Sequence, residues 1–155
     1  MRLWKENEQS TGKRQLTIFV DANTIVSGLI FEGNEALLLR LGRIGLCKLI
    51  TTHYVIDEVT KALHAAEFRL SEEEIITLWT YTNKCIRIGK APNPSQLGKY
   101  SSRLTDKKDV HVLAGFSELN CDILVTGDKE LLRKIPKAKT TRQALDMLLD
   151  EHNFS

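Results

Sequence analysis

Acidic side chains at the expected ends of strands and starts of helices are the residues of this sequence whose types and positions suggest chemistry. Carboxylates that gather in one pocket can bind a hard divalent cation and activate a water molecule for hydrolysis. Acids at helix N-termini, however, also serve simply as caps. The candidates, which lie far apart along the chain, are Asp21, Glu58, Asp106, Asp109 and Asp128.

Asp21 is the acid that a capping role explains least well. It directly follows the apolar run 16–20, and an unpaired charge beside a fully apolar strand loses its hydration. The segment 16–31 contains no lysine or arginine that could neutralise this charge. The other four acids each have an ordinary explanation, either as helix caps or as an exposed helix residue.

A cluster of these carboxylates predicts a bound divalent metal ion. Like charges at close range repel and raise one another's pKa values unless a cation compensates them. Mg²⁺ prefers oxygen ligands and retains several waters, and Mn²⁺ accepts the same ligands. The sequence has no cysteine–histidine cluster of the kind that binds zinc, and of its histidines only His53 and His111 fall near the expected site. The pattern therefore favours Mg²⁺ or Mn²⁺.

Short apolar runs alternate with helical patterns along the chain, which predicts a parallel sheet covered by helices. Ligands of such sheets bind beyond the carboxyl ends of the strands. Asp21 and Asp128 follow two of the expected strands and should therefore lie at that edge. The predicted fold class is a three-layer α/β/α sandwich with a mainly parallel sheet, in a single domain. The expected strands are 16–20, 46–51, 85–88, 122–125 and 137–140.

Helices are expected between these strands and after the last of them. Asn23 or Thr24 is the expected cap of the first helix, and the proline- and glycine-containing segment 89–104 is predicted to be a loop. Residues 1–14 show no periodicity and are predicted to be a flexible segment before a domain at 15–152. The expected helices are 23–29, 35–44, 52–68, 71–84, 105–119, a short helix from 128 and a last helix from 141.

The composition fits one globular domain. The chain has 155 residues, of which 42% are hydrophobic and 27% charged, and its formal net charge of +2 is too small to indicate nucleic-acid binding by itself. No segment approaches the roughly 20 apolar residues needed to cross a bilayer, and the N-terminus has no signal-like run. We therefore expect a soluble cytoplasmic protein. The three cysteines lack CxxC spacing and are expected to be buried, reduced thiols.

Four short motifs, in order along the chain, resemble those of the PIN-domain family. The resemblance runs from about Leu16 to Leu132 and is greatest to prokaryotic, VapC-like members described as toxin components of toxin–antitoxin systems. One difference is that such proteins often carry Asp-Pro-Asp-Asp where this chain has two lysines between its acids. The motifs are VDANTIVSG at 20–28, IDEV at 56–59, DKKDVHVLA at 106–114 and LVTGDKELL at 124–132.

The resemblance implies a Mg²⁺- or Mn²⁺-dependent endoribonuclease that hydrolyses RNA phosphodiester bonds with a metal-activated water. It further implies a toxin role, with an antitoxin protein as partner, and a homodimer. Asp106 would assist the metal through water, while Asn23 and Thr126 would orient the acids or contact the phosphate. The acids that would bind the metal and carry the catalysis are Asp21, Glu58, Asp109 and Asp128.

Basic residues gather around the two later acidic motifs. Residues 84–108 contain seven basic side chains against one acid, and residues 129–142 contain six against one. Such cations give salt-sensitive affinity for phosphate, although charge runs are also ordinary hydrated surface. The candidates for binding the substrate, because they adjoin the acids, are Arg103, Lys107, Lys108 and Lys129.

Two other functions remain open on the sequence alone. The segment from Asp21 to Thr24 nearly matches the Asp-x-Asp-x-Thr motif of haloacid-dehalogenase-like phosphatases, but Asn23 replaces the second acid that those enzymes need as a proton donor. The other alternative is a non-catalytic module that binds RNA or a protein partner.

Overall fold

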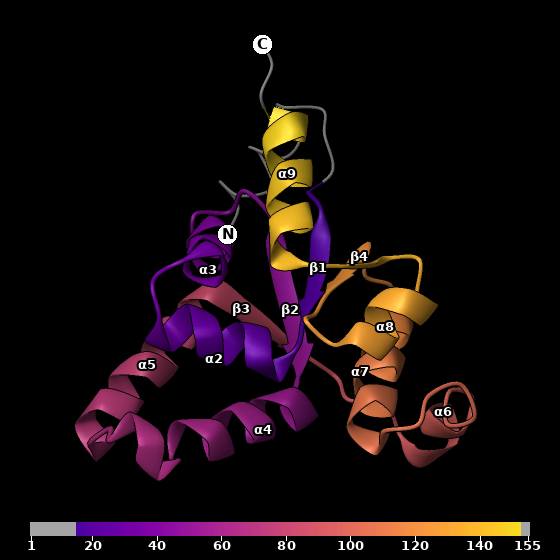
Figure 1. The fold of residues 1–155 in the computed structure, drawn as a ribbon, viewed down its shortest axis with the longest axis horizontal. Coiled ribbons are helices and arrows are strands. Elements are labelled where there is room, and N and C mark those ends of the chain that lie inside the picture. The colour runs from indigo at the N-terminus through magenta and orange to yellow at the C-terminus, as the bar shows by residue number, and fades with distance from the viewer. Residues whose placement is uncertain (1–14, 153–155) are drawn as a thin grey trace.

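The computed structural model describes residues 15–152, which form a five-stranded, all-parallel sheet with the strand order β3-β2-β1-β4-β5 (Figure 1). The predicted parallel sheet is confirmed, and the flexible segment predicted at 1–14 lies outside the described residues. The strands are β1 (Thr17–Val20), β2 (Lys48–Thr52), β3 (Ile86–Gly89), β4 (Ile123–Val125) and β5 (Ala138–Lys139).

The first strand in the sequence is the central strand of the sheet. β1 pairs with β2 on one side and with β4 on the other, and Ile18 is in register with both Leu49 and Ile123. Its apolar side chains are fully buried, as expected for a strand that helices cover on both faces. The residue that follows β1 is therefore held at the middle of the sheet's carboxyl edge.

Helices cover both faces of the sheet and so complete the predicted three-layer sandwich. In Figure 1, α2, α3, α5 and α9 lie on one side of the strands, and α7 and α8 lie on the other. None of the helices within 15–152 is both long enough and apolar enough to span a bilayer. The helices are α2 (Ala22–Ile30), α3 (Asn34–Arg43), α4 (His53–Leu63), α5 (Glu72–Cys85), α6 (Pro94–Gly98), α7 (Lys107–Glu118), α8 (Lys129–Lys134), α9 (Thr141–His152) and the 3₁₀ helix η1 (Ala66–Phe68).

Close packing between α7 and the sheet depends on a glycine. A Cβ atom on Gly115 would lie 2.9 Å from Cε2 of Phe19 on β1 and 3.1 Å from Cγ2 of Thr52 at the end of β2. The absence of a side chain at this position therefore lets α7 approach the carboxyl half of the central strands. This approach brings the N-terminal turns of α7 beside the same edge of the sheet as the ends of β1 and β2.

The segment 89–104 is not the simple loop that its prolines suggested. It contains α6, whose N-cap Asn93 accepts a hydrogen bond from the backbone N–H of Gln96, while the Gln96 side chain accepts one from the Asn93 backbone. Pro94 occupies the first turn, where a missing N–H costs nothing. The loop prediction was wrong at this point because proline was taken as a helix breaker rather than as a helix starter.

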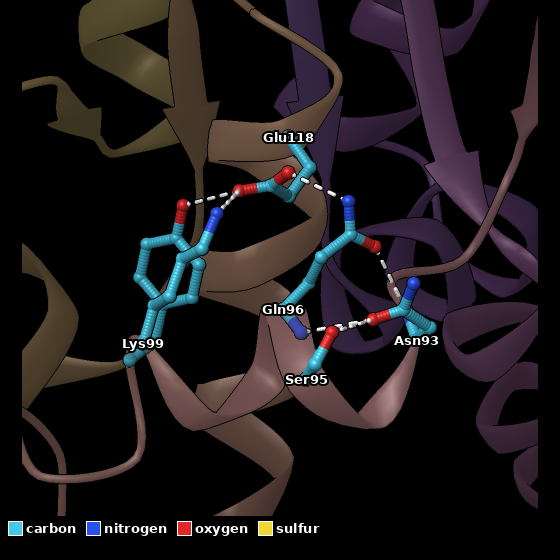
Figure 2. A network of polar contacts seen from close by, with 6 residues as sticks. Asn93, Ser95, Gln96, Lys99 and Glu118 are labelled. Atoms are coloured by element: carbon cyan, nitrogen blue, oxygen red, sulfur yellow. Dashed lines mark hydrogen bonds and ion pairs between the residues drawn. The ribbon is translucent and has the colours of Figure 1, made fainter.

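Glu118 on α7 fastens α6 to the body of the domain (Figure 2). Its Oε1 accepts a hydrogen bond from Nε2 of Gln96 at 2.9 Å, and its Oε2 accepts one from the Tyr100 hydroxyl at 2.7 Å. Lys99 adds an ion pair at 4.0 Å. One half-buried carboxylate thus holds both α6 and the residues that follow it against α7.

Two helix boundaries also differ from prediction. The helix expected at 52–68 ends at Leu63 and is followed by the separate 3₁₀ turn η1. The first helix is capped by Asp21 rather than by Asn23 or Thr24, because the Asp21 carboxylate accepts the backbone N–H of Thr24. Asp21 is therefore both the N-cap of α2 and the first of the candidate metal-binding acids.

The cysteines are buried free thiols, as predicted. Burial raises the pKa of the Cys47 thiol to about 12 and, with a contribution from the neighbouring Asp122, raises the pKa of Cys121 to the same value. Burial also raises the pKa of Cys85. At neutral pH these side chains are protonated, poorly nucleophilic members of the hydrophobic core.

Candidate active site

The carboxyl edge of the sheet brings together acids from the first and last motifs. β1 and β4 are neighbours, with Val20 opposite Val125, so the residues that follow them emerge side by side. The backbone N–H of Asp21 continues this pairing by donating to the carbonyl of Val125 at 3.4 Å. Asp21 and Asp128 therefore share one edge although more than a hundred residues separate them.

Asp21 is a buried carboxylate, with an exposed fraction of 8%. Its Oδ1 accepts the backbone N–H of Thr24 at 3.0 Å, and its Oδ2 accepts the hydroxyl of Thr126 at 2.5 Å. Both bonds compensate part of the hydration that the buried carboxylate loses. Each oxygen retains a lone pair, so the helix-capping role leaves room for a further ligand.

Thr126 connects the acid after β1 to the acid after β4. Its side chain is buried; the hydroxyl donates to Asp21 and accepts the backbone N–H of Asp128 at 3.0 Å. Asp128 in turn caps α8 by accepting the backbone N–H of Leu131 at 2.9 Å. The hydroxyl therefore fixes the spacing between the two acidic segments.

Asp106 and Asp109 approach the same edge from α7. Asp106 is the N-cap of the helix and accepts the backbone N–H of Lys108 at 2.8 Å, while Asp109 lies in the first turn. Burial, with a smaller contribution from the neighbouring carboxylates, raises the pKa of Asp109 from 3.8 to about 6. In decreasing order of effect, these neighbours are Asp128, Asp106, Glu130 and Asp21. The acids of three motifs therefore share one electrostatic environment.

Glu58 approaches the site from α4 but has cationic neighbours. Its Oε2 lies 3.4 Å from Nζ of Lys108 on α7, and its Oε1 lies 4.0 Å from Nζ of Lys61 on its own helix. The Glu58–Lys108 pair bridges α4 and the first turn of α7. Among the described residues, the charge of Glu58 is therefore balanced by two lysines, whereas the charges that shift the pKa of Asp109 are those of other acids.

The donor chemistry of the site fits a hard divalent cation. Its groups are carboxylate oxygens, and a cation bound among them would relieve their mutual repulsion, which adds to burial in raising the pKa of Asp109. Among residues 15–152, however, no three histidine, cysteine or acidic side chains are already grouped closely enough to hold a metal ion. The carboxylates would therefore have to move closer together to bind an ion.

The remaining predicted site residues lie on the surface around these acids. Asn23 is exposed in the first turn of α2. Lys107 and Lys108 begin α7, and Lys129 begins α8, so their exposed side chains flank the acidic edge. Arg103 is also exposed, and its carbonyl accepts a hydrogen bond from Lys134 on α8 at 3.3 Å.

Glu130 is a site residue that sequence reasoning missed. Its charge helps to raise the pKa of Asp109, and it accepts a hydrogen bond from the Thr105 hydroxyl at 3.0 Å. Lys134 lies 2.7 Å from its other oxygen. The available signal was its position in the first turn of α8, two residues after Asp128.

Tyr54 is a second missed residue. It lies in the first turn of α4, and its ring stacks on that of His111 from α7, with the centroids 3.6 Å apart and the planes at 5°. Two aromatic residues 57 positions apart leave no local pattern in the sequence. Only the packing of α4 beside α7 brings them together.

Comparison with known proteins agrees with this arrangement. The crystal structure of PAE2754 from Pyrobaculum aerophilum has the same fold, with a TM-score of 0.59 and 19% sequence identity over 87% of this chain and 96% of that chain. No curated protein matches the sequence. The family profile described as "PIN domain" matches residues 17–130, which include the whole acidic set. PIN domains are generally nucleases and typically use divalent metals. The chain belongs to the PIN-domain family.

Proposed function

We propose that this protein is a Mg²⁺- or Mn²⁺-dependent endoribonuclease that hydrolyses phosphodiester bonds at the acidic edge of its sheet. The observation that carries the proposal is the convergence of acids from separate motifs: the Thr126 hydroxyl bonds both Asp21 and the backbone of Asp128, and the charges of Asp128, Asp106 and Asp21 act on the nearby Asp109. Repulsion among these carboxylates destabilises the fold, and a bound cation would relieve it. Membership of a family that generally contains nucleases supports the same conclusion.

Three aspartates have the best positions to bind the metal: Asp21 from the end of β1, Asp109 from α7 and Asp128 from the start of α8. When bound, the ion would supply a water of lowered pKa and neutralise charge on the phosphate. Thr126 orients two of these acids through its hydroxyl, and Asp106 assists through water. Glu58 stays in the proposed catalytic set, but it must first separate from Lys108 to act as a ligand or base.

The lysines at the helix starts are proposed to bind the RNA backbone. Lys107, Lys108 and Lys129 surround the acids, so they would contact phosphates on either side of the scissile bond. Arg103 is also exposed and lies four residues before the start of α7. This arrangement places a positive rim around a negative centre, which suits a polyanion whose reacting phosphate meets a metal.

The toxin role, the antitoxin partner and the homodimer remain predictions from the resemblance, and the cytoplasmic location remains a prediction from the sequence. A haloacid-dehalogenase-like phosphatase is not favoured, because the family match assigns the acidic motifs to a PIN domain. The assay below distinguishes a nuclease from a non-catalytic RNA-binding module.

The test is metal-dependent cleavage of single-stranded and structured RNA by the wild type, Asp109→Asn and Asp57→Asn. Asp57 is an exposed acid next to Glu58 and serves as the matched control. We expect cleavage with Mn²⁺ or Mg²⁺, none with chelator, a loss of at least about a hundredfold for Asp109→Asn and little change for Asp57→Asn. Binding of RNA without cleavage under any metal condition would favour the non-catalytic module. Cleavage that persists in chelator would refute the metal site.

A further inference from the structure

The stacked rings of Tyr54 and His111 join the same two helices as the Glu58–Lys108 ion pair. Tyr54 is four residues before Glu58 on α4, so the two side chains occupy one face of that helix. His111 is three residues after Lys108 on α7 and so lies one turn along from it. The ring stack and the Glu58–Lys108 ion pair are therefore adjacent bridges between the same two helices.

The charges of Glu58, Lys108 and Asp106 all act on the Tyr54 side chain. Burial and the charge of Glu58 raise its pKa, with Lys108 opposing the shift and Asp106 adding to it. The phenol is thus neutral at physiological pH and lies among groups that would surround a bound phosphate. A nucleotide whose phosphate bound near these groups would have its base close to the aromatic pair.

The pair is not sealed in the core. Both side chains are partly exposed, whereas the apolar residues that flank them, Val55 and Val112, are buried. Parallel rings at 3.6 Å also hold each other in a fixed plane. A fixed, partly exposed aromatic surface is the kind of platform on which proteins stack bases of single-stranded nucleic acids, without preference for sequence.

We propose that the Tyr54–His111 pair is a base-stacking platform that receives an unpaired nucleobase next to the scissile phosphate. This inference rests on the proposed nuclease function. In this role Tyr54 positions the nucleotide, and His111 acts through Tyr54 by holding its ring. The contribution of one stacked base corresponds to roughly a tenfold change in affinity.

The experiment is a thermodynamic cycle between protein and RNA. The affinity of short single-stranded RNA is measured by fluorescence polarisation in Ca²⁺, which also binds oxygen ligands, and intact RNA is verified on gels. Each RNA is compared with a version that lacks one base, with the abasic position moved along the strand. The proteins are the wild type, Tyr54→Leu and the matched variant Tyr54→Phe, which keeps the ring and loses only the hydroxyl.

We expect one abasic position to weaken binding about tenfold for the wild type and Tyr54→Phe but to have no effect for Tyr54→Leu. With 2-aminopurine at that position, binding should quench its fluorescence on the first two proteins only. An equal abasic penalty for all three proteins, or quenching that survives in Tyr54→Leu, would overturn the platform. Because Tyr54→Phe retains the packing of α4 against α7, its loss of the abasic effect would equally count against stacking.

Failure of this proposal is distinguishable from failure of the nuclease proposal. Metal-dependent cleavage of RNA together with binding that ignores every abasic position would overturn the platform and leave the nuclease intact. Tight binding of duplex RNA in preference to the single strand would do the same, because paired bases are already stacked. The absence of metal-dependent cleavage, with the abasic effect present, would instead overturn the nuclease and leave a base-stacking RNA-binding surface.

Discussion

The hydroxyl of Thr126 donates a hydrogen bond of 2.5 Å to Oδ2 of Asp21, and so links the ends of two neighbouring parallel strands. The hydroxyl oxygen of Thr126 also accepts the backbone N–H of Asp128 at 3.0 Å. A single buried hydroxyl therefore satisfies one acid and places the other. Its removal should affect both stability and ligand binding, since an unpaired buried carboxylate oxygen is costly.

Thr126→Val tests this relationship at constant side-chain shape. We expect the free energy of unfolding to fall by about 1 to 2 kcal/mol, because Asp21 and the Asp128 N–H each lose a buried partner. Affinity for Mn²⁺ should fall at least about tenfold, as it does when groups that orient metal ligands are removed. Urea unfolding and isothermal titration calorimetry measure the two effects. Thr126→Ser, which keeps the hydroxyl, should recover most of both.

The raised pKa of Asp109 predicts how stability depends on pH in the metal-free protein. In the folded state this group holds its proton up to about pH 6, whereas in the unfolded chain it releases the proton near its ordinary pKa of 3.8. Its contribution to stability is therefore fully present below pH 3.8 and is lost as the pH rises through about 6. Asp109→Asn should accordingly stabilise the metal-free protein at pH 7.5 by about 1 kcal/mol after allowance for solvent screening. Chemical denaturation in chelator at pH 5 and 7.5 measures the difference; a variant less stable than the wild type at pH 7.5 would contradict the prediction.

Metal binding should depend on pH through the same group. A cation binds the ionised carboxylate, so below the Asp109 pKa of about 6 binding must displace a proton. We expect the Mn²⁺ affinity to fall by about tenfold for each unit of pH below 6 and to level off above it. Competition with a metal-sensitive dye between pH 5 and 8 provides the measurement. An affinity that stays constant over this range would place Asp109 outside the metal site.

The ion pair between Lys108 and Glu58 predicts a specific defect in substrate binding. Replacing Lys108 by methionine keeps the aliphatic stem and removes the charge. We expect weaker RNA binding at low salt and a logarithmic salt dependence that is shallower by about one unit, because one phosphate contact is lost. Lys61→Met is the matched control, since Lys61 pairs with the same glutamate at 4.0 Å but lies one turn further along α4. Equal effects of the two substitutions would mean that Lys108 only neutralises Glu58.

The carboxylate of Glu118 predicts the behaviour of the segment that carries α6. Glu118→Ala removes acceptors for Gln96 and Tyr100 at once, so α6 should detach more often from α7 (Figure 2). We expect faster limited proteolysis within residues 90–105 and a loss of about 1 to 2 kcal/mol in unfolding free energy. Tyr100→Phe removes only one of the two bonds and should give an intermediate rate. Cleavage at an unchanged rate in both variants would show that apolar contacts hold this segment instead.

Local patterns in the sequence were sufficient for most of the sheet and for the first acid. Apolar runs such as 16–20 bury on both faces wherever they lie in a parallel sheet, so their period and length identify them. The acid that ends this run could also be assigned to the carboxyl edge by a general rule of α/β folds. The helix α6 was missed because proline breaks a helix in its interior but starts one at its first turn.

Relationships across the fold could not be read from the sequence. Nothing local indicates that Glu58 meets Lys108, or that Tyr54 stacks on His111, because each pair depends on how two helices cross at the edge of the sheet. The hydroxyl bond from Thr126 to Asp21 is similarly a product of strand order. The acids themselves were identifiable by type and position, whereas their cationic and aromatic neighbours required the packed structure.

The central position of β1 also has a consequence for synthesis of the protein. β1 leaves the ribosome first, but one of its two neighbours, β4, is made about a hundred residues later. A nascent chain that has exposed Asp21 and Glu58 still lacks Asp109 and Asp128, as well as three of the five strands of the sheet that holds them in place. The acidic edge can therefore form only after β4 and Asp128 have been synthesised, so a shorter nascent chain carries no assembled site.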